Sequence, residues 1–288
     1  MKKSILFIIN PISGGKSKLN FPQQAGNYLD QSLFDSEFIF TEKAGHAQQI
    51  VAENLDKDIL VAVGGDGTIN EIASALEGSG KWMGIIPCGS GNGLARAIGI
   101  PLKEGNAVSR LNRLRHTLID SGTLNDRKFF NMAGIGFDAH ISKAFAEHTG
   151  RGLVGYVQTT FREISNYRSQ NYMLEIDGKR YERNAFMISI ANSSQYGNNA
   201  HIAPFASVSD GLLDICIIKP FPLYSFPMMG YRMFSKTAHK SKFVEIIQGR
   251  EIRIIRESAG AVHVDGEPQL MGTELNINIK PLSLSVLT

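Results

Sequence analysis

The clearest sign of the fold is the stretch Ile59-Leu60-Val61-Ala62-Val63-Gly64-Gly65-Asp66-Gly67-Thr68. It begins with an unbroken apolar run, which is typical of a strand buried on both faces of a parallel sheet. The next residues place apolar side chains at Ile69, Ile72, Ala73 and Leu76, the spacing of one helix face. A buried strand, a glycine-rich turn and an amphipathic helix together predict a βα unit.

Two other stretches repeat the pattern of an apolar run followed by a glycine-rich loop. Ile5 to Ile9 precedes the loop Asn10 to Gly15, and Trp82 to Ile86 precedes the loop Pro87 to Asn92. Loops that follow parallel strands converge on one crevice, so we expect the three glycine-rich loops to lie together. We therefore predict an α/β domain with a parallel sheet over residues 1–122.

The rest of the chain has the texture of a β-rich domain. The strand-like runs are Phe129 to Met132, Tyr172 to Ile176, Phe186 to Ala191, Leu213 to Ile218, Ile252 to Ile255 and Leu275 to Ile279. Asp177-Gly178 predicts a tight hairpin turn, and helical patterns interrupt the strands around residues 140–168 and 226–242. We predict a mainly β, sandwich-like domain over residues 123–279, with the segment 280–288 returning to the first domain.

The composition excludes several classes of protein. The 30 basic and 27 acidic residues leave a formal net charge of +3, which argues against a protein that coats nucleic acid. No stretch approaches the roughly 18 consecutive apolar residues of a spanning helix. The first apolar run stops at Asn10, too early for a signal peptide. Two cysteines, Cys88 and Cys216, suggest a reducing compartment. We expect a cytoplasmic protein that meets a membrane only peripherally, on its inner face.

The glycine-rich loops indicate phosphate chemistry. Glycines let backbone N–H groups approach oxyanions, and a helix that follows presents its partly positive N-terminus. Gly15-Lys16-Ser17 is not a P-loop, because the residue five positions before Gly15 is Asn10 and not glycine. The third loop lacks the last small residue of a dinucleotide fingerprint, since Leu94 stands there. Three such loops in one crevice suggest a polyphosphate ligand.

Asp66 is the candidate residue for binding the metal ion that a polyphosphate ligand needs. It is a carboxylate among three glycines beside the expected phosphate site, where Mg²⁺ would neutralise the charge of the phosphate oxygens. The alternative is an ordinary helix cap, although a cap does not require glycine on both sides.

Together these motifs resemble the diacylglycerol kinase catalytic domain family, which includes bacterial lipid kinases and eukaryotic sphingosine and ceramide kinases. The resemblance continues in order along the chain through Gly136-Phe137-Asp138, Ala203-Pro204, Asp210-Gly211-Leu212-Leu213-Asp214 and Asp265-Gly266-Glu267. It implies a nucleotide-binding α/β domain, a β-sandwich domain and an ATP cleft between them. The third loop, with Ser90, resembles the sphingosine and ceramide kinase version, which bears on the identity of the acceptor.

The resemblance also implies site residues. The implied ATP contacts are Asn10, Pro11, Ile12, Ser13, Gly14, Thr41, Gly64, Gly65, Asp66, Gly67, Thr68, Ile69, Asn70 and Ser90. Glu267 resembles the general base of bacterial members, while Asp66 lies on the side of Mg²⁺ and the phosphates and is the rival base. A second, structural Mg²⁺ is implied at the side chain of Asp210 and the backbone carbonyls of Ser207 and Leu212. His201 and His263 flank these motifs, and we expect them to be packed or solvated.

A basic segment lies between Phe226 and Val244. If it is helical, Arg232, Lys236 and Lys240 share a face, and with exposed Met229 and Met233 that face could rest on an anionic membrane. The alternative is a solvated helix face.

We predict from these observations an ATP- and Mg²⁺-dependent lipid kinase, most simply one acting on diacylglycerol or a related glycerolipid. Its expected partners are a lipid at a membrane surface and a second copy of the chain in a homodimer. Two alternatives remain. One is an enzyme like NAD kinase, which shares a Gly-Gly-Asp-Gly motif, and the other is a regulator that binds ATP at a membrane without catalysis.

Overall fold

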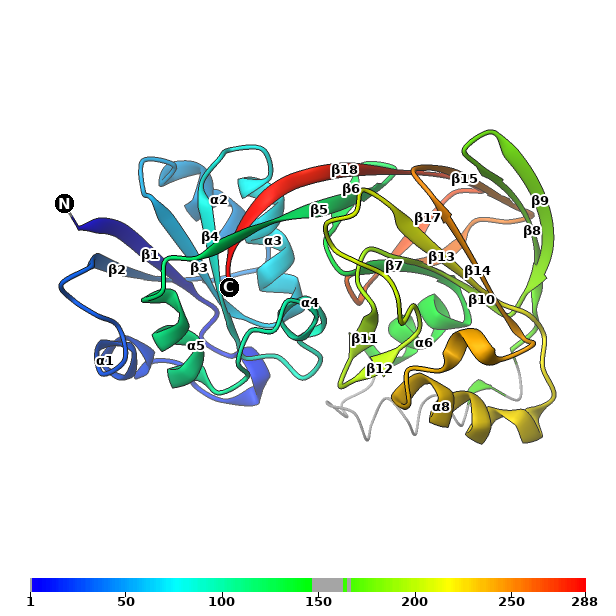
Figure 1. Ribbon diagram of the computed structural model, residues 1–288, viewed down its shortest axis with the longest axis horizontal. Helices are drawn as coiled ribbons and strands as arrows, with labels where there is room; N and C mark the ends of the chain where they lie inside the picture. Colours follow the sequence, from blue (N-terminus) through cyan, green and yellow to red (C-terminus); the bar gives the residue numbers. More distant parts are fainter. Residues whose placement is uncertain (1, 147–162, 165–166) are drawn as a thin grey trace. The chain divides into compact units, whose positions relative to one another are not determined.

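The computed structural model describes residues 2–146, 163–164 and 167–288 (Figure 1). The chain divides into two compact units. Unit 1 consists of Met1–Ile119 together with Leu282–Thr288, and unit 2 consists of Asp120–Pro281.

Unit 1 is built on parallel strands. In the order in which they pair, these are β2 (Phe34–Phe40), β1 (Lys3–Ile9), β3 (Ile59–Gly64) and β4 (Trp82–Pro87). The end of the long strand β18 (Glu274–Leu287) pairs parallel with β4, Ser285 opposite Trp82. The helices of this unit are α1 (Phe21–Gly26), α2 (His46–Glu53), α3 (Asp66–Leu76), α4 (Gly93–Ala97) and α5 (Glu104–Leu111), with a 3-10 turn η1 at Ser13–Gly15. The predicted α/β domain with a parallel sheet is confirmed.

The burial of unit 1 follows its sequence pattern. Every residue of the runs Ile5–Ile9 and Ile59–Val63 is fully buried, as expected for central strands covered on both faces. Helix α3 turns Ile69, Ile72, Ala73 and Leu76 into the core, which is the face that the 3.6-residue period predicts.

Unit 2 is a two-sheet structure. One antiparallel sheet has the order β14 (Val244–Gly249), β13 (Leu213–Ile218), β10 (Met187–Ala191), β7 (Met132–Gly136), β16 (Gly260–Val264) and β17 (Glu267–Met271). The other runs from the first part of β18 through β15 (Glu251–Arg256) and β8 (Gln170–Ile176) to β9 (Lys179–Ala185). The remaining elements are β5 (His116–Leu124), β6 (Arg127–Phe129), α6 (Phe137–Ala146), β11 (Gln195–Gly197), β12 (Ala200–His201), η2 (Leu223–Ser225), α8 (Phe226–Phe234) and η3 (Ala238–Lys240).

The two sheets share one hydrophobic core. Ile188 of β10 and Ile215 of β13 belong to the same buried cluster as Leu174 of β8 and Ile254 of β15. Side chains of two sheets that form one core define a sandwich, so the predicted architecture of this domain is confirmed. Asp177 and Gly178, both with positive φ, form the predicted turn between β8 and β9.

The run Phe129 to Met132 is not one strand, contrary to the prediction. Strand β6 ends at Phe129, β7 begins at Met132, and Phe130 and Asn131 lie between them. The backbone N–H groups of residues 130, 131 and 132 donate to the carboxylate of Asp265. A distant side chain therefore replaces the strand ladder at this point.

The helical segment predicted over residues 226–242 ends early. Helix α8 stops at Phe234, Lys236 adopts a left-handed φ of 58°, and the Thr237 N–H caps the Arg232 carbonyl. Arg232, Lys236 and Lys240 therefore do not share a helix face, and that prediction is wrong. Met229 was expected to be exposed, but it is buried.

The other helical pattern, residues 140–168, is only partly described. Helix α6 covers its beginning up to Ala146, and most of the rest lies outside the described residues. Within the described part of the chain, none of the helices has the length and apolar character needed to cross a membrane.

Candidate active site

The three glycine-rich loops of unit 1 contact each other backbone to backbone. A Cβ on Gly14, whose φ is +67°, would lie 2.1 Å from the Cys88 carbonyl oxygen. A Cβ on Gly89 would lie 2.7 Å from the Gly65 Cα. The loops can approach this closely only because these side chains are absent. The sequence-predicted convergence of the loops is therefore present within unit 1.

Asp66 joins the second loop to the third. Its Oδ2 accepts the Asn92 N–H at 2.9 Å and its Oδ1 accepts the Gly93 N–H at 2.9 Å, at the start of α4. Gly65, and not Asp66, occupies the N-cap position of α3. The carboxylate thus holds the third loop in place, and carboxylate oxygens are also the ligands that Mg²⁺ uses in proteins.

Asn10 joins the first loop to the second. Its Nδ2 donates to the Thr68 hydroxyl at 3.2 Å, its Oδ1 accepts the Ile12 N–H at 3.2 Å, and its backbone N–H donates to the Val63 carbonyl. Thr41, after β2, donates its N–H to the Ile9 carbonyl at the same end of the sheet. These bonds explain why asparagine begins the loop.

The remaining nucleotide contacts predicted in unit 1 differ in their accessibility. Ile12 and Ser90 are exposed, whereas the side chains of Thr68 and Ile69 are buried at 8% and 2% exposure. A ligand could therefore reach residues 68 and 69 only through their backbone. The first turn of α3 begins at this loop, and helix geometry leaves the N–H groups of a first turn without intrahelical partners.

Glu267 lies at a hairpin turn in unit 2. Asp265 and Gly266, with φ of 48° and 88°, connect β16 to β17, and Glu267 follows them with an exposed side chain. Asp265 is buried and has a different role, because its carboxylate accepts three backbone N–H groups. In this motif one acid builds the turn and the next is presented to solvent.

A buried pair beside this hairpin was missed at the sequence level. His263 Nε2 lies 2.6 Å from Asp138 Oδ2, and both side chains are almost fully buried. Burial lowers the pKa of His263, but the charge and hydrogen bond of Asp138 outweigh this effect and raise it overall. The expectation that His263 is packed is confirmed. Its partner, 125 residues away, could not be read from local sequence.

The loop before β13 gathers carboxylates. Asp120 is fully buried and accepts the Gly211 N–H at 2.8 Å, while Asp210 Oδ1 accepts the Leu212 N–H at 3.0 Å. Burial raises the pKa of Asp214 to about 6, and the charge of Asp210 adds to the shift. In the described part of the chain, Asp214 Oδ2 is buried without a hydrogen-bond partner. An orphaned carboxylate oxygen beside other acids fits a bound cation.

The described residues contain no group of three or more His, Cys, Asp or Glu side chains that could hold a metal by themselves. The predicted set at Asp210 uses two backbone carbonyls, of Ser207 and Leu212, and it stays a prediction.

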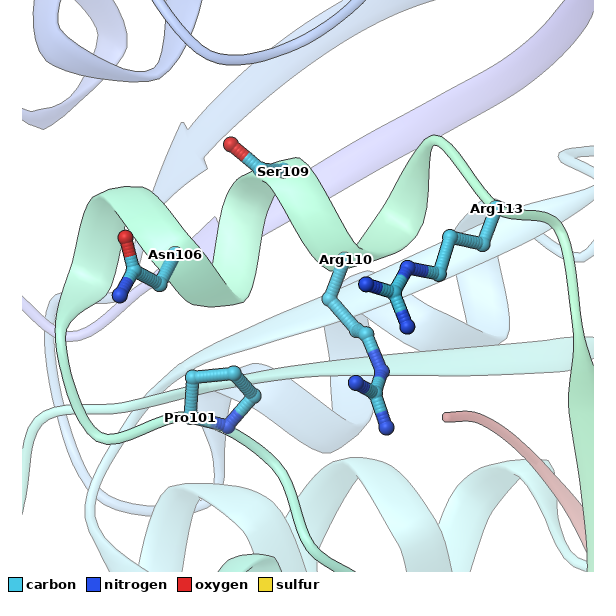
Figure 2. Close-up of a pocket in the computed structure, with 5 residues that line it drawn as sticks. All are labelled: Pro101, Asn106, Ser109, Arg110 and Arg113. Carbon is cyan, nitrogen blue, oxygen red and sulfur yellow. The ribbon is translucent and has the colours of Figure 1, made fainter.

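A surface pocket in unit 1 lies on helix α5, and none of its lining residues is a predicted site residue (Figure 2). It has a volume of about 290 Å³, and its lining residues are Pro101, Asn106, Ser109, Arg110 and Arg113.

Comparison with known proteins matches this arrangement to two domain families. Residues 4–124 match the diacylglycerol kinase catalytic domain, and residues 131–288 match the YegS C-terminal NAD kinase beta sandwich-like domain. The chain belongs to the diacylglycerol kinase catalytic domain family. It is therefore a kinase, and ATP is the phosphate donor that membership in this family implies.

Several relatives of this kinase carry lipid kinase names. A "Probable lipid kinase YegS-like" from Pseudomonas aeruginosa strain UCBPP-PA14 is 33% identical over 254 residues, which cover 85% of this chain and 82% of that protein. A "Diacylglycerol kinase" from Bacillus subtilis strain 168 is 29% identical over 234 residues, covering 78% and 76%. The kinase and the lipid kinase family predicted from the motifs are confirmed.

Solved structures share the fold. The crystal structure of a diacylglycerol kinase from Bacillus anthracis str. Sterne superposes with a TM-score of 0.75 at 20% identity, covering 99% of this chain and 96% of that chain. An NAD kinase from Archaeoglobus fulgidus in complex with ATP superposes with a TM-score of 0.52 at 14% identity, covering 100% and 94%. At these identities the likeness concerns the fold.

Proposed function

We propose that this kinase transfers the γ-phosphate of ATP to the hydroxyl of diacylglycerol or a related glycerolipid, in the cytoplasm and at a membrane surface. The observation that carries the proposal is the backbone contact between the three glycine-rich loops at the start of α3, in a chain whose relatives are named lipid kinases. The relatives' names favour a lipid acceptor over NAD.

The loops supply the phosphate site. Backbone N–H groups at Gly65 to Gly67 and in the first turn of α3 would bind a phosphate oxygen, and the helix dipole would add to the attraction. Asp66 positions this surface, since its carboxylate holds the third loop against the second. The predicted contacts at Asn10 to Gly14, Thr41 and Ser90 complete the proposed nucleotide site.

Glu267 is proposed as the general base. Phosphoryl transfer needs a group that orients the acceptor hydroxyl and accepts its proton. Glu267 is exposed at the end of a rigid hairpin, and the neighbouring Asp265 fixes that hairpin by three backbone bonds. Asp66 is the rival, but both of its oxygens already accept N–H groups.

Mg²⁺ is proposed at two places. With ATP bound, Asp66 would hold the ion that neutralises the phosphate oxygens. The loop Ser207 to Asp214 would hold a second ion through Asp210 and the carbonyls of Ser207 and Leu212, and the orphaned Asp214 oxygen supports a cation there. This second ion would stabilise unit 2. Mg²⁺ should therefore raise the melting temperature of wild type, and Asp210→Ala should remove that increase. Equal melting temperatures with Mg²⁺ and with EDTA would contradict the second site.

The activity is tested with labelled ATP, Mg²⁺ and a panel of lipids in mixed micelles, with NAD as a competing acceptor. We expect a labelled phospholipid, identified by mass spectrometry. Glu267→Gln keeps the size of the side chain and removes its basicity, so kcat should fall by roughly 10² or more while the KM for ATP changes little.

Asp66→Asn separates the two candidate bases. In wild type both oxygens of Asp66 accept backbone N–H groups, but in the variant one of them is replaced by an NH₂ group, which is a donor and cannot accept. One hydrogen bond is therefore lost, and we expect lower activity together with a lower melting temperature. If Glu267→Gln turns over normally while Asp66→Asn binds Mg-ATP and is inactive, Asp66 is the base. Labelled NADP with no labelled lipid would replace the proposed function by that of an NAD kinase.

A further inference from the structure

Helix α8 and the turn before it expose large apolar side chains. Leu223, Tyr224, Met228, Tyr231 and Phe234 have exposed fractions of 55%, 85%, 55%, 67% and 54%. We call these five residues the α8 face. Single exposed apolar residues are ordinary, but five within twelve positions form a patch that usually marks a contact site.

The α8 face lies opposite the side by which the helix packs. Tyr224, Met228 and Tyr231 are spaced i, i+4 and i+7, which places them on one side of a helix. Met229 and Met233 belong to the opposite side, and they pack with Phe226 into the hydrophobic cluster of unit 2. The core therefore accounts for one side of α8 and leaves the other to solvent, where Figure 1 shows the helix at the periphery of unit 2.

The stretch of sequence that contains the α8 face carries acidic residues at none of its positions, but it does carry basic ones. From residue 215 to residue 244 the sequence contains no aspartate or glutamate. Lys236, Lys240 and Lys242 are exposed, and none of them has a carboxylate partner among the residues that the structure describes. Lys219, in contrast, pairs with Glu245 at 2.9 Å. The exposed lysines follow the α8 face directly in the chain.

We propose that the α8 face inserts into the interfacial layer of an anionic lipid bilayer while Lys236, Lys240 and Lys242 contact its headgroups. Tyrosine suits this position because its ring is apolar and its hydroxyl stays hydrated, and lysine is attracted to anionic lipid. A second copy of the chain that met this one through the same stretch would explain the apolar side chains, but residues 215–244 offer no carboxylate to pair with the lysines of the other copy. The inference rests on the proposed function, since a lipid acceptor requires the kinase to reach a membrane.

Vesicle binding tests the proposal without ATP and without turnover. Wild type is co-sedimented with vesicles of phosphatidylcholine alone and of phosphatidylcholine with phosphatidylglycerol. We expect binding to the anionic vesicles, and a loss of about tenfold or more in the variant Tyr224→Ser, Met228→Ser, Tyr231→Ser. Because these side chains are exposed, the melting temperature should stay close to that of wild type.

Matched controls separate the α8 face from general effects of composition. Leu55, Leu102 and Leu118 of unit 1 are 42%, 40% and 45% exposed, and their triple change to serine should leave vesicle binding intact. Lys236→Gln, Lys240→Gln, Lys242→Gln should weaken binding to anionic vesicles by about tenfold or more. The same change at Lys43, Lys103 and Lys179, which are also exposed, should have a smaller effect.

Three results would overturn the proposal. One is unchanged vesicle binding in the Tyr224, Met228, Tyr231 variant. Another is a wild-type dimer that this variant converts to a monomer, with binding to vesicles retained, because the α8 face would then contact a second copy. Equal binding to neutral and anionic vesicles would also contradict it, since the lysines would contribute nothing.

Activity measurements distinguish failure of the docking surface from failure of the proposed function. The α8-face variant should lose activity on long-chain diacylglycerol in anionic vesicles and keep it on a short-chain acceptor in solution. If wild type binds vesicles through the α8 face but phosphorylates no lipid, the docking surface is supported and the proposal of a lipid acceptor is contradicted. Equal loss on both acceptors would mean that the α8 face acts on catalysis and not on docking.

Discussion

The loops of the two units are shaped in opposite ways. In unit 1 the glycine-rich loops meet because side chains are missing, as at Gly65 and Gly89. In unit 2 the connection between β6 and β7 is held by a carboxylate, Asp265, that reaches it across 135 positions of sequence. The first device depends on the absence of side chains and lets backbone segments touch. The second consumes N–H groups and creates a rigid turn.

Carboxylates that stabilise the scaffold can thus be separated from carboxylates that could act on a ligand. A carboxylate that accepts several backbone N–H groups has little capacity left for chemistry, whereas its neighbour on the same turn has an exposed side chain. Asp265 and Glu267 divide these roles within one motif. Asp66 is intermediate, because it binds two N–H groups and still lies at the glycine-rich loops.

The largest effect is expected from removing the carboxylate of unit 2. Asp265→Ala leaves the N–H groups of Phe130, Asn131 and Met132 without their acceptor, and each buried donor without a partner costs about 1–3 kcal/mol. We expect a loss of about 4 kcal/mol in the free energy of unfolding and a fall of about 10 °C in Tm. Chemical and thermal unfolding measure both. Asp126→Ala, at a side chain 82% exposed, is the control and should change little. A stable Asp265→Ala protein would show that solvent replaces the carboxylate.

A smaller effect is expected from adding a side chain to unit 1. Gly14→Ala combines a left-handed φ with a Cβ 2.1 Å from the Cys88 carbonyl oxygen, and we expect a loss of about 3 kcal/mol in unfolding free energy. Gly15→Ala is the matched control, because its φ of +72° is similar but no atom lies within 4 Å of the added Cβ. It should cost only about 1 kcal/mol. Equal losses in the two variants would mean that backbone strain, and not the contact between loops, decides the requirement for glycine.

The smallest effect is expected at a carboxylate that meets side chains instead of backbone. Glu245 Oε1 lies 2.7 Å from Arg183 Nη2, and its Oε2 lies 2.9 Å from Lys219 Nζ. The hydrogen bond from Arg183 is the main reason that the pKa of Glu245 falls to about 2. An acid with a lowered pKa stabilises the fold above its unfolded pKa, near 4.5, and loses that contribution as the pH falls towards 2. The partly exposed side chains reduce the effect, so Glu245→Gln should cost about 1 kcal/mol at pH 7.

The check for Glu245 is the pH dependence of the difference between wild type and Glu245→Gln. That difference should shrink as the pH falls from about 5 to about 2, and it should also shrink in high salt. A constant difference over this range would assign the cost to packing and not to charge.

Local patterns predicted much of the fold. The strands at Ile5–Ile9 and Ile59–Val63 and the buried face of α3 follow from apolar runs and a 3.6-residue period. The hairpin at Asp177-Gly178 follows from its turn chemistry. These features depend on residues that are neighbours in the sequence, which is the information that pattern and propensity carry.

The failures all involve partners that are distant or invisible to periodicity. The break after Phe129 depends on Asp265, and the pairing of Asp138 with His263 spans two elements. The end of α8 depends on the left-handed conformation of Lys236, which cannot be predicted from the presence of a lysine. The glycine-rich loops of the site were predictable, because glycine itself is the signal. The buried carboxylates of Asp120 and Asp214 could not be predicted as site residues, because only the structure shows that they are buried.

The long strand β18 has a consequence for the order in which the protein is made. Its first residues pair with β15, and its last pair with β4, the edge of the sheet that begins at residue 3. A ribosome releases residues 1–119 long before it releases Leu282–Thr288. The nascent unit 1 therefore has an open sheet edge at β4 while the sandwich is synthesised, and this edge is paired only when β18 has been made.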